Sequence, residues 1–107
     1  MDESTFQLRC DAAMEELFEA LSAASDDHGF DVDQNGGAIT VEFEEPKAKF
    51  VVSPNSPVRQ IWLSALTRSF KFDWRDGSFV LPETGATLKE TMGEVIGAQL
   101  GEKVTVD

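Results

Sequence analysis

The stretch RQIWLS, residues 59–64, decides how the predicted sheet is oriented. Successive side chains of a β-strand face opposite sides of the sheet, so Ile61 and Leu63 share one face while Gln60 and Trp62 share the other. If the aliphatic pair belongs to the hydrophobic core, Trp62 faces water. The rest of the sequence must then supply elements that cover the Ile61 face only.

Short runs of alternating apolar and polar residues surround this stretch and predict an antiparallel meander of about six strands. In chain order the runs are FDVDQ, AITVEF, KFVVS, QIWLS, KFDW and SFVL, with NGG and RDG as tight turns between strands. The same alternation sends Phe72 and Trp74 of KFDW inward and leaves Lys71 outward. The meander therefore has one apolar face and one polar face.

The outward face combines an uncovered aromatic ring with polar groups, which is the composition of a protein-binding hot spot. We expect Thr40 and Glu42 of a neighbouring strand to flank Gln60 and Trp62, with Lys71 and Asp73 nearby. The alternative is a tryptophan that packs against neighbouring strands and has no partner.

Two segments with helical spacing flank the meander. The first, about residues 4 to 24, begins with a capping-box spelling at Ser4, and the second has a capping box of Thr87 and Glu90 and ends near Gly101. Residues 102–107 are interpreted as a short tail. The order predicts an α+β fold in a single domain, residues 1–107, with both helices packed on one sheet face.

Composition limits the functional classes. The net charge is −11, and residues 1–45 hold thirteen acidic residues against one cation, Arg9. Such a field repels nucleic acid and anionic lipid and attracts cations or a basic protein surface. No apolar run could span a membrane and the acidic start is unlike a secretion signal, so we expect a cytoplasmic protein. The single cysteine, Cys10, is interpreted as a small buried hydrophobe.

Carboxylates recur on the polar side of the first helix and beyond it. Asp11, Glu15 and Glu19 follow at i, i+4 spacing without a compensating cation. The acidity continues through the predicted loop and into the first strand, at Asp26, Asp27, Asp31 and Asp33. Exposed carboxylates bind hard cations weakly, with water completing the coordination. A solvated face that only keeps the protein soluble is the alternative.

A calcium-loop spelling occupies Asp31 to Glu42, where DVDQNGGAITVE satisfies D-x-[DN]-x-[DN]-G-x5-E. An EF-hand requires a helix after the loop, whereas AITVEF alternates as a strand. Asn35-Gly36 is expected to supply the positive φ angles of a hairpin turn. We therefore favour a hairpin over an EF-hand. His28, just upstream, is interpreted as a solvated loop residue, with a role as one nitrogen ligand left open.

The elements NGGAITVEF, KFVVSPNSPVRQIWLS and KFDW together resemble the frataxin family in its bacterial form, and the resemblance extends over the whole chain. It implies an α-β sandwich that binds ferrous or ferric iron weakly on an acidic ridge, and that docks onto the cysteine desulfurase and scaffold protein of iron-sulfur cluster assembly. By position, the ridge residues are Asp11, Glu19, Asp27, Asp31 and Asp33, with Glu15, Glu16 and Asp26 as further acids. The docking face is Gln60 and Trp62, with Lys71 where the family often has arginine.

The expected function is thus a non-catalytic, iron-binding regulator of cluster assembly that is a monomer without iron. A ferroxidase or iron-storage protein is one alternative, although no Glu-x-x-His pairs of a buried di-iron site are present. A calcium-binding module built on residues 31–42 is the other.

The row of like charges on the first helix generates a stability prediction. Because Asp11, Glu15 and Glu19 repel one another, added salt should raise the melting temperature. Glu15→Gln or Glu19→Gln should stabilise the metal-free protein by a few tenths of a kcal/mol. Thermal melts at low and high salt test both statements. A melting temperature that falls in both tests would mean that the carboxylates are paired within the fold.

Overall fold

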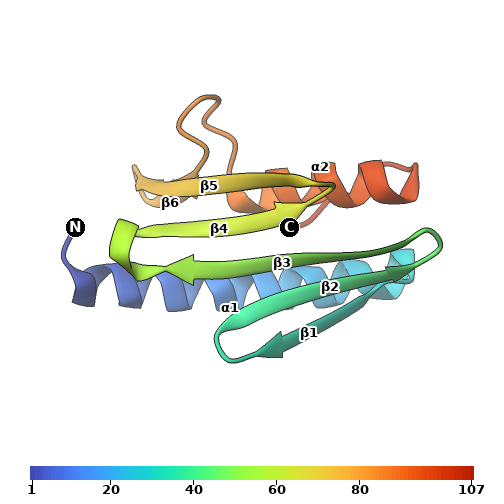
Figure 1. Cartoon of the computed structure of the whole chain (residues 1–107), viewed down its shortest axis with the longest axis horizontal. Helices are drawn as coiled ribbons and strands as arrows, with labels where there is room; N and C mark the ends of the chain where they lie inside the picture. The colour runs from blue at the N-terminus through green and yellow to red at the C-terminus, as the bar shows by residue number, and fades with distance from the viewer.

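A computed structural model describes residues 1–107 as a six-stranded antiparallel sheet with both helices on one of its faces (Figure 1). In chain order the elements are α1 (Glu3–His28), β1 (Asp31–Asn35), β2 (Ala38–Glu44), β3 (Lys47–Asn55), the 3-10 turn η1 (Ser56–Val58), β4 (Gln60–Ala65), β5 (Arg68–Arg75), β6 (Ser78–Val80) and α2 (Leu88–Leu100). The strands pair in sequence order from β1 to β6, as expected for a meander. The α+β class and the one-sided arrangement are therefore confirmed.

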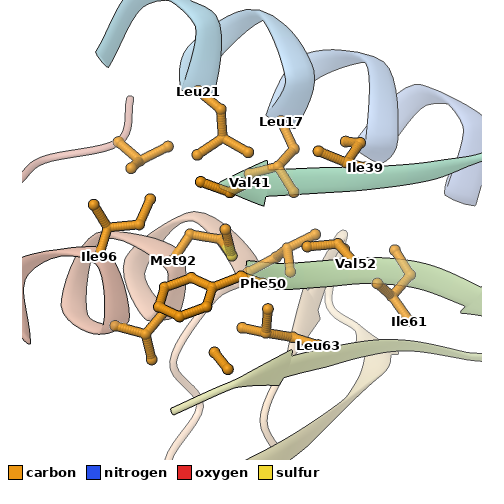
Figure 2. Packing of buried hydrophobic residues seen from close by; sticks show 14 of the residues in the cluster. Leu17, Leu21, Ile39, Val41, Phe50, Val52, Ile61, Leu63, Met92 and Ile96 are labelled. Carbon is orange, nitrogen blue, oxygen red and sulfur yellow. The ribbon is translucent and has the colours of Figure 1, made fainter. Parts of the chain in front are cut away.

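The core lies between the sheet and the two helices. Inward-facing strand residues meet Leu17 and Leu21 of α1 and Met92 and Ile96 of α2, and Figure 2 shows these side chains converging in one layer. Ile61 and Leu63 are buried, as the alternation predicts. Because the inner face is filled in this way, the even-numbered residues of β4 are left on the outer face.

Helix α1 is longer than predicted at both ends. Its N-cap is Asp2, whose carboxylate accepts a 2.7 Å hydrogen bond from the backbone N–H of Thr5, and this bond lowers the pKa of Asp2. The predicted start at Ser4 is therefore wrong. The helix continues through Asp26 and Asp27, which the sequence places in a loop, and ends at His28, with Gly29 as its C-cap at a φ of 72°. Nothing before Gly29 breaks the helix, and glycine adopts the left-handed C-cap readily.

The β1–β2 turn differs by one residue from the prediction. Asn35 still pairs with Ala38, so the two turn residues are Gly36 and Gly37, with φ of 60° and 86°. Two positive φ angles match the twist of the strands and suit consecutive glycines. The register that follows places Asp31 opposite Glu42.

The C-terminal segment is part of the core and not a free tail. Val104 and Val106 are buried, and the segment runs against Gly93 and Gly97 of α2. A Cβ atom on Gly97 would lie 2.8 Å from the carbonyl oxygen of Glu102. Glycine in α2 thus allows two backbones to touch. The α2 capping box of Thr87 and Glu90 is present as predicted.

Neither helix combines the length and apolar character that crossing a membrane would require.

Because another backbone approaches Gly97 closely, the expected effect of Gly97→Ala on stability is opposite to the one that helix propensity alone predicts. In an open helix, Gly97→Ala would stabilise by about 1 kcal/mol. Here the added methyl group meets a backbone carbonyl, and we expect a net destabilisation of about 1 to 2 kcal/mol, measured by chemical denaturation. In a chain that ends at Gly101 the same substitution should become stabilising. Stabilisation in the full chain would show that the segment is not packed there.

Candidate functional site

Trp62 lies on the outer face of β4, which no helix covers, and 36% of it is exposed. Its direct neighbours across the strands are Ser53 on β3 and Lys71 on β5. The Nζ atom of Lys71 lies 4.9 Å from the centre of the indole ring, in cation-π distance. The outward orientation of Trp62, predicted from the alternation, is confirmed.

The predicted flanking residues Thr40 and Glu42 do not border Trp62. They belong to β2, and β3 lies between β2 and β4. Thr40 pairs with Val51, and Glu42 pairs with Lys49. The alternation gave the correct face of the sheet, but it contained no information about which strands were adjacent.

A chain of polar contacts holds the exposed indole. The Nε1–H of Trp62 donates to Oε1 of Gln60 at 2.8 Å, and Nε2 of Gln60 donates to Oδ1 of Asp73 at 2.9 Å. Asp73 also lies 4.0 Å from the guanidinium of Arg75. The ring is therefore held at its edge by an amide and on its face by an ammonium. Such preorganisation lowers the conformational cost of burying an aromatic side chain in an interface.

The β1–β2 hairpin brings carboxylates together on the same outer face. Asp31 lies directly opposite Glu42, and Asp33 lies opposite Thr40. Like charges in directly opposed positions repel, since their Cβ atoms are only about 5 Å apart. On its other side Glu42 faces Lys49, which offsets part of this repulsion. Glu42 was predicted on this face but not among the ridge carboxylates, although a turn centred on Gly36-Gly37 would have revealed its register with Asp31.

Further carboxylates lie on α1. Asp11, Glu15 and Glu19 are exposed, and Nε2 of Gln7 donates to Oδ1 of Asp11 at 2.8 Å. Asp27 is exposed too, but it follows Asp11 by sixteen residues and is rotated by about 160° around the helix from it. The ridge is therefore not a single row along α1.

Glu16, expected as a further acid of the ridge, is exposed and also lines a crevice beside Arg9 and Trp74. This crevice, of about 370 Å³, lies between α1, the β5–β6 turn and the start of α2. Trp74 points inward as predicted and packs on Phe79 with ring centres 5.1 Å apart. It is nevertheless only half-buried, with the Arg9 guanidinium 5.5 Å from its ring.

No three histidine, cysteine, aspartate or glutamate side chains are grouped so as to hold a metal ion. The ridge carboxylates are all exposed hard-oxygen donors, so a cation bound there would keep most of its water. The calcium-loop spelling forms the β1–β2 hairpin and not an EF-hand, as expected. Its first and last residues, Asp31 and Glu42, face each other across the two strands.

His28 is not the solvated loop residue that the sequence suggested. It is the last residue of α1, it is half-buried, and its Nδ1 contacts the Glu102 carboxylate just beyond α2. This contact joins the ends of the two helices. The prediction missed it because nothing local in the sequence connects residues 74 positions apart.

Cys10 is buried in the core under α1, as interpreted from the sequence. Burial, with a smaller contribution from the Asp11 charge, raises the pKa of its thiol to about 11. The thiolate is therefore disfavoured near neutral pH, and Cys10 has the environment of an inert structural cysteine.

Comparison with known proteins places this geometry in a family. A family model described as the frataxin-like domain matches residues 1–102. The structure is similar to a frataxin from Psychromonas ingrahamii, with a TM-score of 0.78, 26% sequence identity, and coverage of 100% of this chain and 99% of that one. It is also similar to a trimeric frataxin from the yeast Saccharomyces cerevisiae, complexed with ferrous iron, with a TM-score of 0.74, 24% identity, and coverage of 88% and 87%.

Proposed function

We propose that this chain, which belongs to the frataxin-like domain family, binds iron weakly at its exposed carboxylates and regulates or supplies iron-sulfur cluster assembly in the cytoplasm. In this proposal the protein is a monomer without iron and docks onto the cysteine desulfurase and scaffold protein through the outer face around Trp62. The family match over residues 1–102 is the observation that carries the proposal.

The carboxylate arrangement supports a weak cation site on the β1–β2 hairpin. Asp31 and Glu42 are directly opposed and repel each other, and Asp33 lies two residues further along the same face. A divalent cation near this pair would relieve the repulsion at no cost in folding contacts. The surrounding negative field of residues 1–45 would raise the local cation concentration. The α1 carboxylates add to this field.

The charge distribution on the outer face supports docking onto a partner that carries both signs. Strands β1 and β2 present Asp31, Asp33 and Glu42, whereas β3 presents Lys47 and Lys49. Trp62 lies on β4, beyond the lysines. A basic region of the partner would face the hairpin, while the aromatic anchor would occupy a pocket, and such complementarity sets orientation as well as affinity.

A ferroxidase remains the competing hypothesis, and one observation favours binding without catalysis. A di-iron oxidation centre uses carboxylates that project into a protein interior. Thr91 is the only buried polar residue in this structure, and no aspartate or glutamate is buried. We therefore propose that iron is a cargo or a regulatory signal for this protein.

Charge reversal on the hairpin tests the metal site. Asp31→Lys should strongly weaken binding of Fe(II) under anaerobic conditions, and of Co(II), because exposed ligands act mainly through summed charge. The same substitution places a cation opposite Glu42, so the metal-free fold should gain a few tenths of a kcal/mol. NMR titration reports the affected amides, and thermal melts report stability.

Glu94→Lys is the matched control, since it makes the same charge change at an exposed position on α2. It should leave the β1–β2 amide shifts nearly intact. If both variants weakened Fe(II) binding equally, the result would contradict a site on the hairpin. Catalytic oxygen consumption during the Fe(II) titration would favour the ferroxidase instead.

Removing the exposed aromatic ring tests the docking face. Trp62→Ala should change the free energy of unfolding by about 1 kcal/mol or less, yet lose roughly thirtyfold in affinity for the desulfurase complex. Trp74→Ala is the control: it removes a packed ring next to Phe79, so it should destabilise more while leaving docking unchanged. Calorimetric titration measures the affinity for the desulfurase complex, and thermal melts measure the stability of each variant. Unchanged affinity of Trp62→Ala would exclude this face as the docking surface.

A further inference from the structure

Part of one sheet edge is unpaired. Strand β5 spans Arg68–Arg75, but β6 pairs only with its last three residues, Asp73 to Arg75. Arg68 to Phe72 pair with β4 on one side and with no strand on the other. In Figure 1 the short β6 lies beside only one end of β5, and the segment that follows it loops away from the sheet.

The two turns that bound β5 determine which backbone groups face the open side. Each is a two-residue turn, closed by the pairs Ala65–Arg68 and Arg75–Ser78. Residues that close such a turn form a hydrogen-bonded pair, and the direction of the N–H and C=O groups alternates along the strand. The backbone N–H and C=O groups of Arg68, Phe70 and Phe72 therefore point to β4. Ser69 and Lys71 direct theirs to the open side.

A groove of about 580 Å³ lies along this open edge. One wall is formed by Arg68 to Lys71 of β5, and the opposite wall by residues 81–84. In the second wall, the amide and carbonyl groups of Leu81 are engaged locally, with Ala86 and Gly85. The backbone donors and acceptors of Ser69 and Lys71 thus border a groove without a partner strand.

The charges at the groove define the partner. Lys71 lies on the outer face, whereas Arg68 lies on the helix side and stacks on Phe70 at 4.7 Å, so cations flank the edge from both faces. Only Glu83 among the lining residues is acidic. Successive side chains of an extended peptide point to opposite faces of the sheet. An acidic side chain on the outer face would therefore meet Lys71, and one on the helix side would meet Arg68. A second copy of this edge would instead bring like charges together.

We propose that the open edge of β5 binds an acidic, extended peptide segment of another protein by β-strand addition, using the backbone groups of Ser69 and Lys71. This site borders the docking face, because Lys71 contacts the Trp62 ring and Gln60 also lines the groove, but it uses the backbone edge of β5 and not the indole. The partner segment would enter the groove between β5 and residues 81–84 and pair antiparallel or parallel to β5.

Hydrogen exchange and peptide titration test the site in the full chain. In the free protein the Ser69 and Lys71 amides should exchange rapidly, while those of Phe70 and Phe72 are protected. A short acetylated peptide of alternating glutamate and valine should shift and protect the Ser69 and Lys71 amides in NMR spectra, and the lysine-valine counterpart should not. Equal shifts with both peptides, or no shift with the acidic one at millimolar concentration, would overturn the proposal.

Matched variants separate backbone pairing from charge. Ser69→Pro removes a donor that faces the groove and should weaken peptide binding roughly fivefold, the value of one hydrogen bond, whereas Ser69→Ala retains it. Arg68→Gln should weaken binding, while Arg75→Gln, on the part of β5 paired with β6, should not. Trp62→Ala leaves the backbone groups of Ser69 and Lys71 in place and should retain most of the peptide binding, which distinguishes this test from loss of docking through the indole. Ser69→Pro binding as well as Ser69→Ala, or self-association of the free protein through this edge, would exclude peptide addition.

Discussion

The one-sided burial of the sheet is the constraint on which the rest of this structure depends. Two helices are enough to cover one face of six strands, and the core cluster is built entirely on that side. Since strand side chains alternate with a period of two, burying Ile61 and Leu63 forces Gln60 and Trp62 outward. A shift of one residue in register would exchange the faces and bury the polar network of Gln60 and Asp73. The same alternation thus sets both the buried core and the composition of the exposed face.

The two helices need more than their own apolar stripes to close the core. The segment after α2 adds Val104 and Val106 to the buried layer, and the glycines of α2 let its backbone approach closely. The contact of His28 with Glu102 joins the end of α1 to the start of this segment. The segment with Val104 and Val106 therefore helps to cover the inner face of the sheet, whereas the outer face is covered by no helix or segment.

The sequence was sufficient wherever a local pattern determined the outcome. The strand alternation gave both sheet faces, and the capping box of Thr87 and Glu90 gave the start of α2. The sequence was insufficient where two neighbouring residues could fill the same structural role, or where the outcome depended on contacts between residues distant in the chain. Ser4 and Asp2 were both competent N-caps, and only the folded helix distinguished them. The burial of Val104 depends on a close approach to Gly93, which no local pattern encodes.

The candidate site shows the same division between local and distant information. The exposed carboxylates could be named from the sequence, but their grouping could not, because it depends on strand order and helical phase. Asp27 belongs to α1 and not to the predicted loop, so it lies on a different side of the helix from Asp11. Glu42 lies opposite Asp31 because the β1–β2 turn is displaced by one residue from the predicted one. The hairpin thereby places the first and last residues of a calcium-loop spelling face to face without forming a calcium loop. A surface of this kind concentrates cations through its field and not through a fixed cage, so a cation near it would keep most of its water and exchange readily.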